Sequence, residues 1–256
     1  MYPYIYLFNY RISSYGLLMC VACVLVGTIC LCRVKSRGVV PEDVLIVGAC
    51  ALGIGLFLGG LFFVIITYPL PVIWENIIRG RFEMFFGGIV FYGGLVGGIV
   101  GALLGCKVAG CSYKSIIQVV VPYIPLGHGI GRIGCVLAGC CNGMPYNGPF
   151  ALYISSNETG VESYTGHFPV QIVETLINLG LCFFLHKYER NKGGKYLLEL
   201  YLLIYSIARF GLEFLRGDDI RGITGGLSTS QWISIFLIGV SVVRIIFEKY
   251  LKKEHR

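Results

Sequence analysis

The sequence predicts an all-α polytopic membrane protein with about seven transmembrane helices. Of its 256 residues, 55% are hydrophobic, and the mean hydropathy is +0.74. Only 14% of the residues are charged, which is too few to cover the surface of a water-soluble domain of this length. Apolar runs of about 20 residues, the length that crosses the hydrocarbon core of a bilayer, recur along the chain. These observations place most side chains against lipid or against other helices.

Seven apolar runs account for most of the chain, and we expect each to form one membrane span. The fourth run is the least regular, because Pro122 and Pro125 interrupt the helical pattern and closely spaced glycines follow. We therefore expect the fourth span to be broken or irregular. The predicted spans are Tyr15–Leu31, Val44–Tyr68, Met84–Leu104, Ser115–Leu137, Val170–Leu185, Tyr196–Leu215 and Ser228–Phe247.

Lys and Arg residues are unevenly divided between the two sides of the predicted membrane. Fourteen of the 21 follow the first, third, fifth or seventh span, and five lie on the opposite side. Because basic residues are retained on the cytoplasmic side, we expect the N-terminus outside and the C-terminus in the cytoplasm. Residues 142–168 contain no Lys or Arg, so we expect an outer-face loop there, within a single domain over residues 1–256. The net charge of +7 thus reflects topology, and we expect no nucleic-acid partner.

The third predicted span is rich in glycine. Gly94 and Gly98 are four residues apart, and Gly97, Gly101 and Gly105 continue that spacing. Small residues at this spacing let two helix backbones approach closely, so we expect tight helix packing. Tyr92 is the exception in this segment, because it places a polar group between two glycine pairs.

Ionisable and polar side chains gather near the predicted outer ends of several spans. Charged groups inside a membrane are costly and therefore indicate function. Arginine keeps its charge when desolvated and binds phosphate in a fork, so these residues predict a partly hydrated pocket for an anionic phospholipid headgroup. The candidates are Tyr15 on the first span, His128 and Arg132 on the fourth, Gln171 and Glu174 on the fifth, and Arg209, Glu213 and Arg216 on the sixth.

Structural roles are open alternatives for several of these side chains. Arg209 and Glu213 are four residues apart and can form an ordinary ion pair that fastens helices together. Arg216 can simply lie at the membrane interface. Gln171 and Glu174 are more often packing groups than reactive ones. Arg132 is harder to explain in this way, because its glycine-rich neighbours provide no local carboxylate.

The 11 cysteines lie mostly inside apolar runs, which does not indicate a disulfide framework. Small buried packing residues are the favoured interpretation for most of them. Cys135, Cys140 and Cys141 are clustered after Arg132, and a metal or redox site that uses these thiols with His128 is the alternative. We favour packing and expect no metal ligands here.

Six short segments provide a further signal through their order along the chain. They are SYG at Ser14–Gly16, GGIVFYGGLVGG at Gly87–Gly98, PYIPLGHGIGRIG at Pro122–Gly134, PVQIVE at Pro169–Glu174, ARFGLEFLRGDD at Ala208–Asp219 and LSTSQWIS at Leu227–Ser234. The ordered set resembles the prolipoprotein diacylglyceryl transferase family over nearly the whole chain. No single segment is specific for this family. The order of the segments, the seven spans and the orientation are specific when taken together.

The resemblance implies a multi-pass enzyme of the bacterial plasma membrane that needs no cofactor. Such enzymes transfer the diacylglyceryl group of phosphatidylglycerol, a membrane lipid, to the lipobox cysteine of a lipoprotein precursor. A thioether forms and glycerol phosphate leaves. By the same resemblance, Arg132 and Arg209 correspond to the family's essential arginines and Tyr15 to its tyrosine on the first span. We expect Tyr92, His128 and Arg209 to be catalytic, and Tyr15, Arg132, Gln171, Glu174, Glu213 and Arg216 to bind substrate.

The chain also departs from the family pattern. Tyr92 stands where the family has histidine, and a tyrosine, with an ordinary pKa near 10, is a poor base at neutral pH. Cys135, Ala138 and Cys140 stand where the family has two asparagines and a glutamate. His128 replacing the missing base is one hypothesis. A transferase with another acceptor and a non-enzymatic lipid-binding membrane protein are the alternatives.

Overall fold

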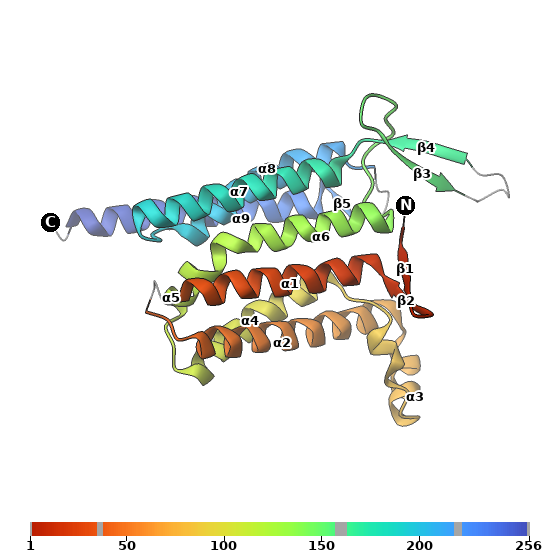
Figure 1. The fold of residues 1–256 in the computed structure, drawn as a ribbon, viewed down its shortest axis with the longest axis horizontal. Helices are drawn as coiled ribbons and strands as arrows, with labels where there is room; N and C mark the ends of the chain where they lie inside the picture. The colour runs from red at the N-terminus through yellow and green to blue at the C-terminus, as the bar shows by residue number, and fades with distance from the viewer. Residues whose placement is uncertain (1, 35–37, 157–162, 218–221, 255–256) are drawn as a thin grey trace. The chain divides into compact units, whose positions relative to one another are not determined.

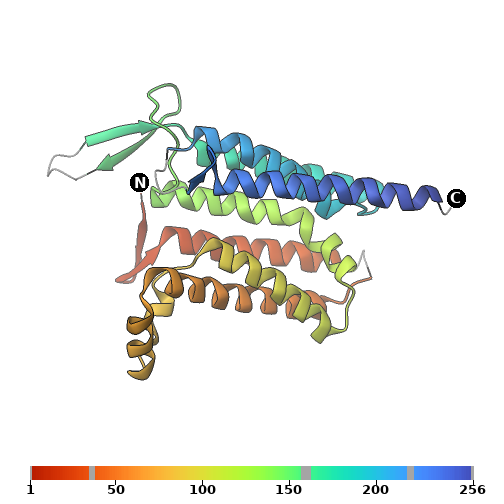
Figure 2. The ribbon, with the colours of Figure 1, turned by 180° about the vertical axis from the view of Figure 1, so that it is seen from behind.

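A computed structural model of the chain describes residues 2–34, 38–156, 163–217 and 222–254. Contacts divide them into two compact units, which Figures 1 and 2 show in ribbon form from opposite sides. The first unit comprises the described residues of Met1–Thr28 and Val120–Arg256, and the second comprises those of Ile29–Val119. The single domain expected from the sequence stays a prediction.

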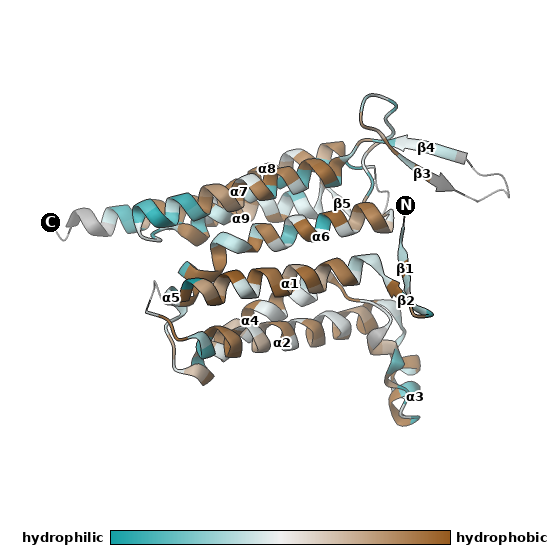
Figure 3. Cartoon of the chain, viewed as in Figure 1, coloured by the Kyte–Doolittle hydropathy of each residue, from teal (hydrophilic) through white to brown (hydrophobic). Residues whose placement is uncertain are grey.

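Helices make up most of the described chain and confirm a polytopic, largely α-helical membrane protein. Six helical stretches are long and apolar enough to cross a membrane. Figure 3 shows hydrophobic residues along the lengths of these helices and hydrophilic residues at the far end of α7. The six are α1 (Ser14–Arg33), α2 (Pro41–Thr67), α4 (Phe91–Ala109), the stretch Tyr113–Ala138, α7 (Val170–Lys192) and α9 (Thr229–Glu254).

The sixth predicted span corresponds to α8 (Leu197–Leu212), which has 16 residues and continues into the 3-10 turn η4 (Glu213–Leu215). At about 1.5 Å per residue, such a helix extends about 24 Å. The hydrocarbon core of a bilayer is about 30 Å thick, so α8 alone is shorter than a full span. A count of seven spans, and the orientation of the chain, stay predictions.

The fourth predicted span is interrupted, as the two prolines indicated. The helix α5 (Tyr113–Val120) ends at the 3-10 turn η3 (Val121–Tyr123), which contains Pro122, and α6 (Ile124–Ala138) follows. Pro125 occupies the first turn of α6, where its missing N–H removes no helical hydrogen bond. Gly139 ends α6 in the left-handed conformation, with φ of 72°.

In the second unit, α2 and α4 lie side by side and glycines line their contact (Figures 1 and 2). A Cβ atom placed on Gly97 would lie 2.6 Å from the carbonyl oxygen of Ile54, closer than any real packing contact. The close helix packing expected from the glycine spacing is therefore confirmed. The connection between the two helices contains α3 (Leu70–Ile78) and the 3-10 turn η2 (Phe82–Phe86).

The predicted start of the third span at Met84 is wrong. Met84 belongs to η2, and the chain is extended at Val90, where φ is −84° and ψ is 122°, before α4 starts at Phe91. Before α4, Gly88 lies against α2, where a Cβ atom would be 2.6 Å from the ring of Phe63. The hydropathy of the sequence does not predict this break before α4.

The first unit contains α6 to α9, packed in sequence, and the three short antiparallel hairpins that depart from an all-α fold. Residues 142–168, expected to form a loop, include the hairpin of β3 (Leu152–Ser156) and β4 (Ser163–His167). Residues 157–162 of that loop lie outside the described chain. The other hairpins pair β1 (Tyr4–Leu7) with β2 (Tyr10–Ser13) and β5 (Ile223–Thr224) with β6 (Leu227–Ser228).

One end of the first unit, here called the hairpin end, gathers the last turn of α6, the first turns of α7 and α9 and the hairpin β3–β4 (Figures 1 and 2). Backbone hydrogen bonds tie the chain after α6 to its neighbours. The amide of Met144 donates to Leu215 at 2.8 Å, and the amide of Phe168 donates to Met144 at 2.9 Å. The predicted site residues of α6, α7 and α8 are therefore held toward the same end.

Candidate functional site

A buried carboxylate on α7 is the centre of the polar network in the first unit. Glu174 is only 2% exposed. Its Oε2 forms an ion pair with Nε of Arg132 at 2.9 Å, and its Oε1 accepts a hydrogen bond from the Tyr205 hydroxyl at 3.0 Å. His128 Nε2 lies 3.5 Å from the same Oε1. Glu174 therefore connects side chains from α6 and α8, and supplies the partner that the sequence around Arg132 lacks.

The helix α6 packs against α7 at Gly129, at ordinary packing distances. The carbonyl oxygen of Gly129 lies 3.2 Å from the hydroxyl of Thr175. A Cβ atom on Gly129 would lie 3.5 Å from the backbone oxygen of Thr175 and equally close to Asn178. His128 and Arg132, four residues apart, share the face of α6 that meets Glu174, as their spacing predicted.

A second buried ion pair lies on α8. Arg209 Nη1 is 2.7 Å from Glu213 Oε2, and its Nη2 donates to the hydroxyl of Ser230 on α9 at 3.2 Å. The side chain of Arg209 is 12% exposed and that of Glu213 only 3%. The ion pair considered from the sequence thus exists, and it holds the Arg209 guanidinium in one position.

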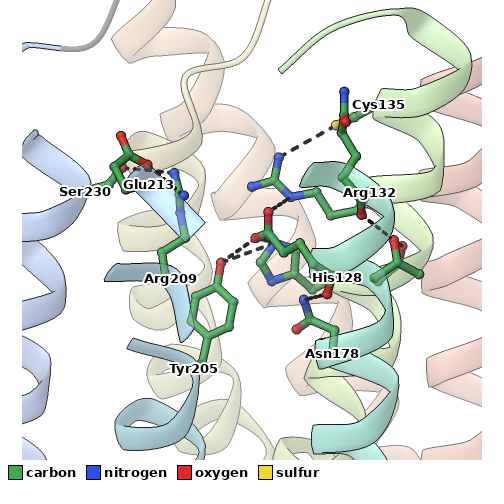
Figure 4. Close-up of polar contacts among 12 residues, drawn as sticks. His128, Arg132, Cys135, Asn178, Tyr205, Arg209, Glu213 and Ser230 are labelled. Carbon is green, nitrogen blue, oxygen red and sulfur yellow. Dashed lines mark hydrogen bonds and ion pairs between the residues drawn. The ribbon is translucent and has the colours of Figure 1, made fainter. Parts of the chain in front are cut away.

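The two arginines lie on either side of the Tyr205 hydroxyl. Figure 4 shows the guanidinium group of Arg132 extending toward α8, while that of Arg209 points to Glu213 and Ser230. The positive charges of both arginines act on His128 and on Tyr205. Both side chains are largely buried, and each is paired with one buried carboxylate. Two cations from separate helices are thus held, already desolvated, at one place in the first unit.

Gln171, Tyr15 and Arg216 surround the end of α6. Gln171 is 1% exposed, and its Nε2 donates to the carbonyl oxygen of Cys140 at 2.9 Å. Tyr15, in the first turn of α1, packs against α6, since a Cβ atom on Gly134 would lie 3.1 Å from its ring. The backbone of Arg216 pairs with Gly143 in an isolated bridge. These residues position the chain around the network, and their contact with a substrate stays a prediction.

The chain that follows α6 is rich in thiols, and its electrostatics are unusual. The thiols of Cys135 and Cys140 can donate hydrogen bonds to Cys141. Together with the positive charges of Arg132 and Arg216, they lower the pKa of the Cys141 thiol.

Tyr92 belongs to the second unit and is the second residue of α4. Its side chain is 40% exposed, and its ring contacts that of Phe91 edge to face at 5.6 Å. A hollow of about 370 Å³ in the same unit is lined by Tyr68, Asn76, Arg81, Glu83, Met84 and Gly87, none of which is a predicted site residue. The catalytic role expected for Tyr92 stays a prediction.

Tyr205 and Ser230 belong to the network but were not predicted. Tyr205 precedes Arg209 by four residues and therefore shares its helix face, which is the signal that identifies it in retrospect. Ser230 lies near the start of α9, an apolar helix with two other serines, Ser234 and Ser241. Nothing in its local sequence separates it from them.

Comparison with known proteins identifies the family of this chain. The chain matches the family model for prolipoprotein diacylglyceryl transferase over residues 3–247. The phosphatidylglycerol–prolipoprotein diacylglyceryl transferase of Clostridium tetani (strain Massachusetts / E88) is 30% identical, over 96% of this chain and 97% of its own length. Transferase 2 of Clostridium perfringens (strain 13 / Type A) is 35% identical, over 91% of this chain and 89% of its own. The chain therefore belongs to the prolipoprotein diacylglyceryl transferase family.

Proposed function

We propose that this protein transfers the diacylglyceryl group of phosphatidylglycerol to the lipobox cysteine thiol of a lipoprotein precursor. The family, and the names of relatives aligned over nearly their whole length, support the reaction. The observation that supports the site is a pair of buried arginines, Arg132 on α6 and Arg209 on α8, which lie on either side of the Tyr205 hydroxyl (Figure 4). A lipid phosphate is the anion that two desolvated guanidinium groups at the end of a membrane helix suit best.

In this reaction a carbon–sulfur bond replaces a carbon–oxygen bond. The sulfur of the acceptor attacks the glyceryl carbon, the bond from that carbon to the phosphate oxygen breaks, and glycerol phosphate leaves with the bond electrons. Negative charge therefore grows on the leaving phosphate. Arg132 and Arg209 would stabilise that charge in a water-poor environment, where such an interaction is stronger than in water.

The acceptor thiol must also lose its proton, because the thiolate is the nucleophile. His128 is the base that we favour, since its Nε2 lies 3.5 Å from both Glu174 Oε1 and the Tyr205 hydroxyl. Glu174 would stabilise the imidazolium once the proton arrives. Tyr92, at the position of the family's histidine, is the alternative base from the second unit.

The spans support a multi-pass membrane protein. We propose that it resides in the bacterial plasma membrane, with the hairpin end of the first unit toward the outer face. The first turns of α7 and α9 then start outside, and the basic ends of α7 and α9, with Arg190, Lys192 and Arg244, lie toward the cytoplasm. Lipid and a secreted precursor would both reach the arginines from that outer side.

The test is a lipidation assay with purified protein, phosphatidylglycerol vesicles and a lipobox peptide, read by the mass of the peptide. We expect the mass of one diacylglyceryl group to be added. His128→Ala should slow transfer by about 10²–10⁴-fold if His128 is the base, whereas Tyr92→Phe should have a small effect. Arg79→Ala is the matched control, because that ion pair with Glu75 is 56% exposed on both sides. An unmodified peptide, beside a relative that modifies it, would contradict the proposal.

A second candidate keeps the lipid site and changes the acceptor. Cys135 and Cys140 beside Arg132, where the family has an asparagine and a glutamate, favour it, because they alter the surroundings of the leaving phosphate. Lipid and peptide mass spectrometry of cells with and without the gene separates the two functions. Changes confined to lipoproteins would exclude the second candidate.

A further inference from the structure

Three thiols converge where α6 ends. The Sγ atoms of Cys135, Cys140 and Cys141 all lie within 4.8 Å of one another. Cys135 is buried in the last turn of α6, Cys141 is partly buried and Cys140 is exposed. Among the described residues, these three form the group whose ligand atoms lie close enough together to hold a metal ion.

The convergence is a property of the backbone. Gly139 reverses the chain with φ of 72°, so the amide of Cys140 donates to the carbonyl of Cys135 at 3.1 Å and that of Gly139 to Val136 at 3.2 Å. This pair of bonds is the motif that closes many helix ends. Cys141 then adopts φ of 60°, which is unusual for a residue with a side chain. Both reversals turn the later thiols back toward Cys135.

The surroundings hold the cluster in place and supply positive charge. Gln171 Nε2 donates to the Cys140 carbonyl at 2.9 Å and fixes the backbone between the thiols. Arg132 Nη1 lies 3.9 Å from Cys135 Sγ. Packing alone does not require a residue with a side chain to adopt a positive φ, as Cys141 does.

We propose that Cys135, Cys140 and Cys141 bind one Zn²⁺ ion through their three sulfurs. Zinc–sulfur bonds of about 2.3 Å place three sulfurs around one ion about 4 Å apart, so a small closure of the present cluster suffices. Binding releases the thiol protons, and three thiolates on Zn²⁺ leave one net negative charge that Arg132 offsets. The fourth zinc position would open on the side of the exposed Cys140.

His128 is not part of this site, in contrast to the alternative considered from the sequence. Its Nε2 lies 3.5 Å from Glu174 Oε1, within the arginine network. The zinc site is therefore a three-sulfur site beside that network, linked to it through Arg132. Zinc binding does not depend on the proposed lipid transfer, because metal content is measured without either substrate.

The first experiment measures zinc per chain by elemental analysis, in protein purified without chelators and reloaded with Zn²⁺. We expect about one ion per chain. The triple variant Cys135→Ser/Cys140→Ser/Cys141→Ser should lose it. Cys20→Ser/Cys23→Ser/Cys182→Ser is the matched control, since it removes the same number of thiols outside the cluster, and it should keep the ion. Equal zinc in wild type and the cluster variant would overturn the proposal.

A second measurement tests the zinc site even if the triple variant does not fold. Co²⁺ in place of zinc gives sulfur-to-metal charge-transfer absorbance only when thiolates coordinate it. The wild-type protein should show this absorbance, and Cys140→Ser, at the exposed thiol, should weaken Co²⁺ binding by about tenfold or more. No such absorbance in the wild type, or a disulfide among the three cysteines in protein isolated with its thiols trapped, contradicts a zinc site.

Discussion

Glu174 is the residue on which the arrangement of the site depends. Its carboxylate is almost fully buried, and it contacts Arg132, His128 and Tyr205 at 3.5 Å or less. Removing its charge leaves a buried guanidinium without its counter-ion, which costs more than the pair contributes. Loss of this carboxylate also releases the imidazole of His128 and the phenol of Tyr205, which Glu174 orients.

Glu174→Gln should therefore lower both stability and activity. We expect a loss of about 3–5 kcal/mol in the free energy of unfolding, because a buried ion pair is broken on one side only. Thermal unfolding in detergent measures it. Glu75→Gln is the control, since its pair with Arg79 is 56% exposed and should contribute about 0.2–1 kcal/mol. Equal losses for the two variants would show that Glu174 is not the centre of the network.

Tyr205→Phe tests the hydroxyl that sequence reasoning missed. A hydrogen bond to a charged group contributes about 1.5–3 kcal/mol, so the transfer rate should fall about tenfold or more if this bond orients Glu174 for catalysis. Tyr201→Phe is the matched control, because Tyr201 stacks on Tyr205 with ring centroids 6.0 Å apart on the same helix. Loss of activity in Tyr201→Phe alone would exclude this role for the Tyr205 hydroxyl.

The sequence could identify the charged members of the site but not the uncharged ones. Arg132, Arg209, Glu174 and Glu213 are conspicuous, because charge is rare in these helices. Which carboxylate pairs with Arg132 depends on how α6 meets α7, and no local pattern encodes that. The role of Tyr205 is equally hard to predict, because its spacing of four residues from Arg209 places it on the same helix face but does not show that it contacts Glu174.

At the scale of elements, the contact between α2 and α4 is built from backbone against backbone. A Cβ atom on Gly97 would meet the Ile54 carbonyl at 2.6 Å, whereas one on Gly53 meets nothing within 4 Å. The helices must therefore separate to admit a side chain at Gly97. A side chain at Gly53, on the exposed side of α2, does not require the helices to separate.

Gly97→Val should destabilise the second unit, while Gly53→Val should leave its stability almost unchanged. Overpacking of a tight core costs about 1–3 kcal/mol. Thermal unfolding of the two variants in detergent compares them directly, because both place the same side chain in a membrane helix. A melting temperature for Gly97→Val as high as that of Gly53→Val would contradict the glycine-mediated packing.

Elements set by strong local signals were predictable, and those set by contacts were not. Proline at 122 indicated the break between α5 and α6, and glycine spacing indicated the close approach of α4. The start of α4 at Phe91 was not predictable from hydropathy, because the apolar run continues across both Met84 and Phe91. The hairpin β3–β4 lies in a segment that hydropathy classifies only as polar.

For the whole molecule, orientation is the prediction that links the site to its substrates. The excess of Lys and Arg predicts a cytoplasmic C-terminus and an outer hairpin β3–β4. A green fluorescent protein fused to the C-terminus should fluoresce, because it folds in the cytoplasm. Alkaline phosphatase fused after Phe168 should be active, because it needs the oxidising outer side. Inactive phosphatase with a dark C-terminal fusion would reverse the orientation and place the arginines at the wrong face.

The proposed mechanism depends on the joint action of Arg132 and Arg209 on one lipid phosphate. Its most direct test is the rate of peptide lipidation by wild type, Arg132→Ala, Arg209→Ala and the double variant, with Arg244→Ala, a 60%-exposed arginine of the same unit, as control. The lipidation rate of each single variant should fall about 10²–10³-fold. The rate of the double variant should be little lower than that of the slower single variant, because both cations stabilise the same phosphate charge. Wild-type rates in either single variant would contradict the account.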